Sequence, residues 1–463
     1  MSLIKSISGI RGTLGGKVGD ALTPLDIVKF VSAYGTWVLE TSKKEKVVIG
    51  RDARQSGEMV SNLVIGTLQG LGIDVINLDL ATTPTVEIAV VAENAGGGII
   101  ISASHNPVQW NALKLLDENG EFISNEAGQF ILDLATNERF EYAKVGALGK
   151  HHKNTTYLQK HIDLILALPL VDAEAIASQD FSIMVDGVNS VGGVAVPMLL
   201  KALGVKKIHE LFCEPNGQFP HNPEPLPEHL SIICSEIAGG DYDLGIVVDP
   251  DVDRLAFICE DGSPFGEEYT LVAVADYVLQ QKVGNTVSNL SSTRALKDVT
   301  LKRGGQYFAA AVGEVNVVRA MKENHAIVGG EGNGGIILPE LHYGRDALVG
   351  IALFLTHLAK TKKSALMLKA SYPSYHISKN KIELTHDIDV DYILAKVKER
   401  YQKQPINSID GVKIEFDNEW VHLRKSNTEP IIRIYSESAS QSTADFLAKK
   451  IIMDIKEIIT EKE

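Results

Sequence analysis

Residues 46–54 read KVVIGRDAR and residues 70–80 read GLGIDVINLDL, with a helix-length segment between them. A short apolar run, a helix and a second apolar run are typical of a strand–helix–strand unit. The pattern returns in FSIMVDGVNS (181–190) with ALGVKKIHELF (202–212), and in NTVSNLSSTR (285–294) with RGGQYFAAAVG (303–313). The paired strands are about 20 to 25 residues apart each time, which predicts three related α/β domains.

The pattern changes after Lys369, where period-2 strands alternate with helices and no glycine-rich phosphate turn occurs. This texture predicts a separate C-terminal α+β domain. We therefore predict four domains, with boundaries at 1–150, 151–255, 256–369 and 370–463. Because no long polar linker separates them, we expect the domains to pack closely around a shared site.

Composition excludes several classes of function. The 463 residues are 44% hydrophobic and 22% charged, as in ordinary globular chains, and 45 Lys and Arg against 59 Asp and Glu give a net charge of −14. Such a charge disfavours nucleic acid as a partner. The scattered cysteines, Cys213, Cys234 and Cys259, match neither a disulfide framework nor a zinc site. The N-terminus has no apolar leader and no run reaches membrane-spanning length, so we predict a cytoplasmic protein.

The stretch GGGIIISASHNPVQWNALKLLDENG (96–120) contains the first candidate site. Ser104 follows a buried strand-like run and precedes His105, Asn106 and Pro107, where a side chain faces a cleft and backbone N–H groups are free. Ser104 is therefore a candidate nucleophile, with simple turn formation as the competing interpretation. The absence of a G-x-S-x-G elbow argues against acyl transfer.

The stretch LGIVVDPDVDRLAFICEDG (244–262) contains the second candidate site. In extended backbone Asp249, Asp251 and Asp253 would face one point and need a cation between them, and oxygen ligands with room for phosphate favour Mg²⁺. An EF-hand is the alternative, because Glu260 fits its twelfth position. It fails where Arg254 replaces the required glycine and where both flanks read as strands.

Two further stretches predict ligand contacts. HLRKSNTEPIIRIY (422–435) carries arginines and neutral donors suited to a phosphate, and AIVGGEGNGGIILPE (326–340) carries a carboxylate and an amide suited to sugar hydroxyls. The candidate binding residues are Glu331, Asn333, Arg424, Ser426, Asn427, Thr428 and Arg433. Taken alone, the stretch 422–435 is better explained by an ordinary turn, and the stretch 326–340 is explained equally well by one.

Taken together and in this order, these segments resemble the α-D-phosphohexomutase superfamily, which includes phosphoglucomutases, phosphomannomutases and phosphoglucosamine mutases. The resemblance covers nearly the whole chain and rests on SASHNP, DPDVDR, GEGNGG and RKSNTEPIIR, with SGIRG and GRDAR as supporting signatures. It implies a heart-shaped enzyme in which each of four domains contributes one loop to a central cleft.

The resemblance also implies a reaction. Ser104 would carry a phosphoryl group, one Mg²⁺ per chain would be held by Ser104, Asp249, Asp251 and Asp253, and a hexose 6-phosphate and 1-phosphate would interconvert through a hexose 1,6-bisphosphate. The implied catalytic residues are Ser104, Lys114, Arg11, His105 and Arg254, with Lys114 and Arg11 as proton-transfer and charge-stabilising groups. Positioning and charge neutralisation are what phosphoryl transfer requires.

The chain departs from the commonest pattern of that superfamily in two loops. DPDVDR replaces Asp-Gly-Asp-Gly-Asp-Arg, and Asn333 and Gly335 stand where Ser and His are frequent. The sugar loop is most similar to those of phosphoglucosamine or mixed phosphohexose mutases. We therefore expect a phosphorylated hexosamine or hexose as substrate. The expected activity is that of a phosphoglucosamine mutase, with phosphomannomutase/phosphoglucomutase as the alternative. We expect the protein to be a monomer or a homodimer.

Two rival functions remain open. A haloacid-dehalogenase-type phosphotransferase would use Asp249 as the nucleophile with Mg²⁺, and a non-catalytic sugar-binding module would use the acidic loop for a structural Ca²⁺. Both leave SASHNP and the order of the four segments unexplained.

Overall fold

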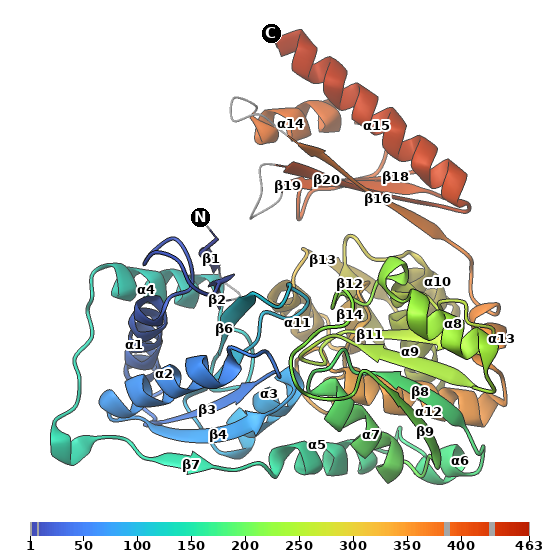
Figure 1. The fold of residues 1–463 in the computed structure, drawn as a ribbon. Helices are drawn as coiled ribbons and strands as arrows, with labels where there is room; N and C mark the ends of the chain where they lie inside the picture. The colour runs from blue at the N-terminus through green and yellow to red at the C-terminus, as the bar shows by residue number, and fades with distance from the viewer. Residues whose placement is uncertain (1, 7–8, 384–388, 426–430, 463) are drawn as a thin grey trace.

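The computed structural model describes residues 2–6, 9–383, 389–425 and 431–462, and the strands in these ranges form four sheets (Figure 1). The sheets have seven, four, four and five strands along the chain. The first three mix parallel and antiparallel pairs, whereas the described pairs of the fourth are antiparallel. The predicted fold class, three α/β units and one α+β unit, is confirmed.

The first sheet has the order β1-β2-β6-β5-β3-β4-β7. Its strands are β1 (Ile4–Ser6), β2 (Gly9–Thr13), β3 (Lys46–Arg51), β4 (Asp74–Leu80), β5 (Gly97–Ile101), β6 (Trp110–Leu116) and β7 (His151–Lys153). Its helices are α1 (Pro24–Thr41), α2 (Gly57–Gly70), α3 (Thr83–Ala92) and α4 (Asn125–Thr136). Helices α1, α2 and α4 share a core on one face of the sheet, and α3 covers the other.

The second and third sheets have the orders β11-β10-β8-β9 and β13-β12-β14-β15. The second unit comprises α5 (Tyr157–Leu166), α6 (Ala173–Ala177), β8 (Ser182–Asp186), α7 (Gly192–Ala202), β9 (Lys207–Leu211), α8 (Ser231–Gly239), β10 (Leu244–Val248) and β11 (Leu255–Cys259). The third comprises α9 (Glu267–Gln281), β12 (Asn285–Asn289), α10 (Ala295–Lys302), β13 (Tyr307–Ala310), α11 (Glu314–Glu323), β14 (Ala326–Glu331), β15 (Gly335–Ile337), α12 (Ala347–Thr361) and α13 (Ala365–Lys369).

One topology recurs in these three units. In each, the two strands predicted from the sequence pair in parallel through one helix: β3 with β4, β8 with β9, and β12 with β13. The next strand, β5, β10 or β14, adds in parallel on the other side of the first. It then turns into an antiparallel partner, β6, β11 or β15. The prediction of one unit used three times is therefore confirmed.

Gly96 and Gly97 are explained by the close approach of α1, and of Ser42 that caps its end, to the start of β5. The hydroxyl of Tyr34 donates to the carbonyl oxygens of Gly98 at 3.0 Å and Leu116 at 2.7 Å. A Cβ at Gly97 would lie 2.2 Å from that hydroxyl oxygen, so only glycine fits there. Gly97 thus leaves room for the Tyr34 hydroxyl to bind the strand that leads to Ser104.

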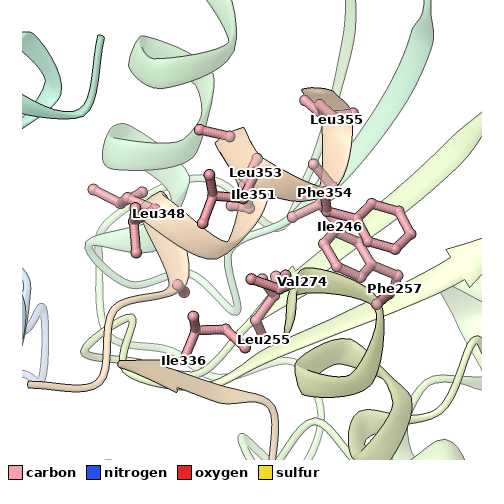
Figure 2. Packing of buried hydrophobic residues seen from close by; sticks show 14 of the residues in the cluster. Ile246, Leu255, Phe257, Val274, Ile336, Leu348, Ile351, Leu353, Phe354 and Leu355 are labelled. Atoms are coloured by element: carbon pink, nitrogen blue, oxygen red, sulfur yellow. The ribbon is translucent and has the colours of Figure 1, made fainter. Parts of the chain in front are cut away.

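The second and third units share one hydrophobic core (Figure 2). Helix α12, buried along almost its whole length, packs between their sheets. Phe354 of α12 stacks on Phe257 of β11 with ring centroids 3.9 Å apart. Burying one such side chain contributes about 2–3 kcal/mol. A common core fixes the loops of these two units relative to each other.

The fourth sheet, of order β16-β20-β19-β18-β17, stands apart from the other three in Figure 1 and has its own core. It comprises β16 (His376–Glu383), α14 (Val390–Arg400), β17 (Ile406–Asn407), β18 (Val412–Glu415), β19 (Trp420–Lys425), β20 (Ile431–Ser438) and α15 (Gln441–Lys462). Lys413 Nζ donates to the carbonyl of Leu290 at 2.8 Å, and Ser291 Oγ lies 2.9 Å from His422 Nδ1. These bonds tie the fourth unit to the loop after β12.

Two strands extend past the predicted domain boundaries at residues 150 and 255. The domain boundaries remain predictions. Strand β7 pairs with β4 in the first sheet although it starts after residue 150, and β11 pairs with β10 across the boundary at 255. The β4–β7 pairing joins segments far apart in the sequence, so the local pattern does not reveal it. Among the described helices, none combines the length and apolarity that a membrane span needs.

Candidate active site

Three of the four predicted loops occupy the same position in the repeated topology. Ser104 lies between β5 and β6, the three aspartates lie between β10 and β11, and Asn333 lies between β14 and β15. Each loop is therefore the turn from the third parallel strand into its antiparallel partner. The fourth predicted loop joins β19 to β20, and its residues Ser426, Asn427 and Thr428 fall outside the described residues.

Ser104 is buried and faces the acidic loop. Its Oγ donates to Asp249 Oδ2 at 2.7 Å and lies 3.3 Å from His105 Nδ1. Its φ of 49° is in the left-handed region, which a non-glycine residue rarely adopts and which costs free energy unless the surroundings impose it. The strand β5 ends three residues earlier, at Ile101, so Ser104 belongs to the turn.

Arg54 imposes the conformation of the Ser104 loop. Its guanidinium is fully buried, with NH2 donating to the carbonyls of Ser104 at 2.5 Å and Asn106 at 2.6 Å. The Nε atom pairs with Asp52 at 3.0 Å. Asp52 in turn accepts from Ser102, whose Oγ receives the N–H of Ser104 at 2.9 Å. In the sequence GRDAR is only a supporting signature, and no local pattern predicts that Arg54 clamps the Ser104 loop by binding its carbonyl groups.

The three aspartates converge, but by a different route from the one predicted. The carboxylates of Asp249, Asp251 and Asp253 are fully buried and lie within 4.8 Å of one another. They do not alternate along an extended strand, because β10 ends at Val248 and the chain turns through Val252, whose φ is 64°. The proline and valine of DPDVDR are thus compatible with a turn that gathers all three side chains.

Lys114 balances part of this negative charge. Its Nζ lies 2.5 Å from Asp251 Oδ2 and 3.3 Å from Asp253 Oδ2. Burial opposes the charge on Lys114, but the two carboxylates outweigh it and raise the pKa of this lysine. Burial and the charges of Asp253 and Asp251 raise the pKa of Asp249 well above its usual range. Arg345, Lys114 and Arg254 have the opposite effect on Asp253, whose pKa they lower despite its burial.

The acidic loop fits a divalent metal ion. Within the described part of the chain, Asp251 Oδ1 and Asp253 Oδ1 are buried and have no hydrogen-bond partner. Orphaned buried carboxylate oxygens are costly unless a cation occupies the space between them. An all-oxygen set is the ligand chemistry of Mg²⁺ or Ca²⁺. Among the described residues one other group could hold a metal, namely His161, His342 and Asp346, but its ring nitrogens already face carboxylates and a hydroxyl.

His105 and Arg254 complete the surroundings of Ser104. Burial and the Arg254 guanidinium lower the pKa of His105 well below its usual range, so its imidazole is neutral. Arg254 NH1 pairs with Glu224 Oε1 at 2.7 Å. The pKa of Arg11 is lowered by burial and by the charge of Arg254, which indicates a crowded cationic pocket.

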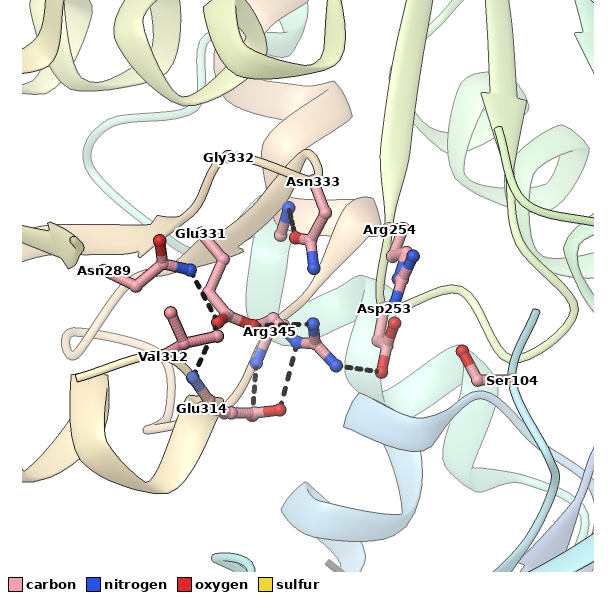
Figure 3. A network of polar contacts seen from close by, with 12 residues as sticks. Ser104, Asp253, Arg254, Asn289, Val312, Glu314, Glu331, Gly332, Asn333 and Arg345 are labelled. Atoms are coloured by element: carbon pink, nitrogen blue, oxygen red, sulfur yellow. Dashed lines mark hydrogen bonds and ion pairs between the residues drawn. The ribbon is translucent and has the colours of Figure 1, made fainter. Parts of the chain in front are cut away.

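Glu331 is the last residue of β14, and its carboxylate lies in a polar network (Figure 3). Its Oε1 accepts from Asn289 Nδ2 at 2.8 Å and from the N–H of Gly313 at 3.1 Å, and its Oε2 accepts from Arg345 at 2.9 Å. Asn333 Oδ1 accepts the N–H of Gly335 at 3.1 Å, as expected of a turn residue. Asn333 also lines a neighbouring cavity.

The loops enclose a cleft of about 400 Å³. Residues from all four sheet units line it, and the cationic ones are Arg11, Lys114, Arg254, Arg345, Arg424 and Arg433. Six cations against Glu314 and Glu331 favour an anionic ligand. A separate cavity of about 460 Å³ beside Asp276 shares none of these residues.

Family models match the chain in four consecutive segments. They are the phosphoglucomutase/phosphomannomutase alpha/beta/alpha domain I over residues 4–142, domain II over 159–262, domain III over 266–375, and the C-terminal domain over 383–453. The four matches together span most of the chain and follow the order of the four sheets.

Individual proteins agree with the family models. The chain is 36% identical to a phosphoglucomutase/phosphomannomutase of Thermococcus kodakarensis, over 94% of this chain and 95% of the relative. It is 31% identical to a phosphoglucosamine/phosphogalactosamine mutase of Sulfurisphaera tokodaii, over 97% and 98%. A phosphoglucomutase/phosphomannomutase family protein of Burkholderia thailandensis shares the fold with a TM-score of 0.82, at 23% identity over 99% of this chain and 98% of that one.

An N-acetylphosphoglucosamine mutase of Aspergillus fumigatus, solved with GlcNAc-6P and magnesium, has a TM-score of 0.58 at 14% identity, over 92% of this chain and 97% of that one. The same fungal mutase has been solved in complex with glucose 1,6-bisphosphate. At these identities the likeness establishes the fold alone. The full-length relatives and the four family models establish more: the chain belongs to the phosphoglucomutase/phosphomannomutase family and is a phosphohexomutase enzyme.

Proposed function

We propose that this phosphohexomutase interconverts a hexosamine 6-phosphate and the corresponding 1-phosphate through a phosphoserine on Ser104 and a bound 1,6-bisphosphate. One observation carries the proposal. The Oγ of Ser104 lies 2.7 Å from an oxygen of the buried aspartate cluster, inside a cleft lined by six cationic side chains. This combination provides a nucleophile, a metal site and a phosphate-binding surface together.

We assign one Mg²⁺ per chain to Asp249, Asp251 and Asp253, with a phosphate oxygen on Ser104 as a further ligand. Their buried all-oxygen set and the two orphaned oxygens support this assignment. When bound, the cation withdraws charge from the phosphoryl group in transfer. The fungal relative solved with magnesium makes the choice of metal consistent within the fold.

The other side chains around Ser104 have different roles in the phosphoryl transfer. His105 lies beside the reacting oxygen, with its Nδ1 3.3 Å from Ser104 Oγ, and we assign proton transfer to Lys114 and Arg11. Lys114, held between Asp251 and Asp253, and Arg11 stabilise the charge that spreads over the phosphoryl oxygens. Arg254, paired with Glu224, extends the same cationic wall. Phosphoryl transfer depends mainly on such positioning and neutralisation.

The other end of the substrate needs its own site, because the bisphosphate must present each phosphate to Ser104 in turn. Arg424 and Arg433 come from paired positions on β19 and β20 and line the cleft. We assign them, with Ser426, Asn427 and Thr428 of the connecting loop, to the phosphate that is not reacting. Glu331 and Asn333 would contact the sugar hydroxyls in both orientations. The predicted segments 1–150, 151–255, 256–369 and 370–463 would then each contribute one loop.

Two observations bear on the substrate. Several relatives of nearly full length carry phosphoglucosamine mutase names, which favours a hexosamine phosphate. The relative from Thermococcus kodakarensis is named phosphoglucomutase/phosphomannomutase, so glucose and mannose phosphates are the second candidates. A hexose 1,6-bisphosphate is the expected activator, because it phosphorylates Ser104.

The test compares rates with glucosamine 6-phosphate, glucose 6-phosphate and mannose 6-phosphate on one preparation, before and after addition of a hexose 1,6-bisphosphate. We expect glucosamine 6-phosphate to give the highest kcat/KM, and phosphopeptide mapping to locate an alkali-labile, hydroxylamine-resistant phosphate on Ser104. Ser104→Ala should lose at least about three orders of magnitude in rate, because the covalent route is closed. A hydroxylamine-labile phosphate on Asp249 would instead establish the aspartyl-phosphate rival.

A further inference from the structure

Arg345 is the cation at which the metal loop and the sugar loop meet (Figure 3). It precedes Asp346, the residue that caps α12, and its side chain is almost wholly buried. NH2 lies 2.8 Å from Asp253 Oδ2, NH1 lies 2.9 Å from Glu331 Oε2, and Nε lies 3.0 Å from Glu314 Oε2. Each nitrogen of one guanidinium thus pairs with a carboxylate from a different segment.

The three carboxylates have different positions in the site. Asp253 belongs to the aspartate cluster, Glu331 ends the strand before the sugar loop, and Glu314 begins α11 at the wall of the cleft. The N–H of Arg345 also donates to Glu314 Oε1 at 3.0 Å, which fixes the backbone from which the fork projects. One side chain therefore sets the distance between metal site and sugar site.

Arginine is suited to this position for a geometric reason. Its planar guanidinium presents donors in several fixed directions, whereas a lysine ammonium is a single point charge. A guanidinium stays protonated in proteins, so Arg345 faces Asp253, Glu314 and Glu331 as a cation. The cation is permanent, and it neutralises carboxylates that would otherwise repel one another.

Arg345 also decides which oxygen of Asp253 is available. It occupies Oδ2, which Lys114 approaches at 3.3 Å, while Oδ1 is one of the two buried oxygens of the aspartate cluster that have no hydrogen-bond partner in the described residues. Mutating a group that hydrogen-bonds to a metal ligand, and so orients it, commonly lowers metal affinity by roughly 10- to 100-fold. We propose that Arg345 is a positioning residue that orients Asp253 toward the metal ion and locks the sugar loop, through Glu331, in register with it.

The proposal deepens the proposed function, and its kinetic consequences rest on it, but its first test does not. Mn²⁺ binding to the substrate-free protein, measured by electron paramagnetic resonance, reports the metal site without turnover. We expect Arg345→Lys to raise the Kd for Mn²⁺ by roughly 10- to 100-fold. The matched control is Arg303→Lys, because Arg303 pairs with Asp276 at 2.7 Å in the same unit but outside the cleft. It should leave the Kd unchanged.

A second variant guards against misfolding of the first. Glu314→Gln keeps the arginine but removes one charged anchor of its fork. We expect Glu314→Gln to raise the Kd for Mn²⁺ by a smaller factor than Arg345→Lys does. In the double variant, the Kd should rise by less than the product of the two single factors, because both changes disrupt the same fork. Melting temperature and circular dichroism select preparations that are folded, so that the comparison concerns the site.

The competing role is direct contact of Arg345 with a substrate phosphate, since it lines the cleft. In that case Arg345→Lys would raise KM for the sugar phosphate with an unchanged Kd for Mn²⁺, and the proposal is overturned. An effect of Arg303→Lys equal to that of Arg345→Lys would overturn it too. If the wild type binds Mn²⁺ but turns over no hexose phosphate, the proposed function fails while the Mn²⁺ measurements still decide the role of Arg345.

Discussion

The conformation of Ser104 is expected to depend on Arg54 more than on any residue of its own loop. Besides the carbonyls of Ser104 and Asn106, its NH1 donates to those of Pro107 at 2.8 Å and Trp110 at 3.1 Å. The perturbation is Arg54→Met, which keeps an unbranched apolar side chain of similar length and removes every donor. It should release the loop that holds Ser104 in the left-handed region.

The magnitude follows from burial. Both Asp52 and Arg54 have side chains with 0% exposure, and removing one partner of a buried ion pair costs about 3–5 kcal/mol. A domain has a free energy of unfolding of about 5–15 kcal/mol, so the variant should be markedly less stable yet still able to fold. Asp52→Asn combined with Arg54→Met removes the uncompensated charge and should recover about half or more of that loss.

Activity should not recover with stability. A displacement of a reacting atom by about 1 Å can cost roughly 100-fold in rate, so kcat should stay at least about 100-fold below wild type in both variants. Urea unfolding gives the stability and single-turnover transfer from phosphorylated enzyme gives the rate. The control is Arg51→Met, whose partly exposed pair with Asp79 should contribute about 1 kcal/mol or less. A double variant that regains near wild-type kcat would refute the clamp.

Asp251→Asn should weaken Mg²⁺ binding at least about tenfold and lower kcat together, because it removes charge with little change of shape; activity insensitive to EDTA in the wild type would contradict this. Arg424→Ala should raise KM, lower kcat and leak bisphosphate into solution, whereas wild-type behaviour in all three would reduce the β19–β20 connection to an ordinary turn. His342 lies 3.3 Å from Asp346 and 3.1 Å from Glu87; burial lowers its pKa, but these carboxylates outweigh burial and raise it to about 10. Its stabilising effect is therefore complete below the unfolded pKa of about 6.5 and lost as pH rises toward 10, so the difference in urea midpoint between wild type and His342→Gln should shrink over that range.

The general form of the protein could be read from local sequence. Apolar runs alternating with helix-length segments predicted the repeated α/β unit, and the change of period after Lys369 predicted the fourth unit. These patterns are local, because a strand or helix must show its buried face every second or every third to fourth residue. The order of the four loop segments then predicted the family.

Local pattern was a weaker guide to how the aspartates meet. The alternation of Asp249, Asp251 and Asp253 correctly predicted a cluster, but the backbone between them turns instead of running straight. A spacing of two residues brings side chains together in a strand, and a turn can do so as well. The end of β10 at Val248 depends on its pairing with β11 and with β8, and β8 lies far away in the sequence.

The sequence by itself determined the repeated unit, the chemical groups available to the site and the family. Only the tertiary structure decided which groups hold the others in place: Arg54 acts on the carbonyl of Ser104 from 50 residues away, and Arg345 acts on Asp253 from 92 residues away. The physical reason is charge burial. A buried carboxylate or strained loop must be satisfied by whichever donor the fold brings near it, and that donor leaves no periodic signal in the chain.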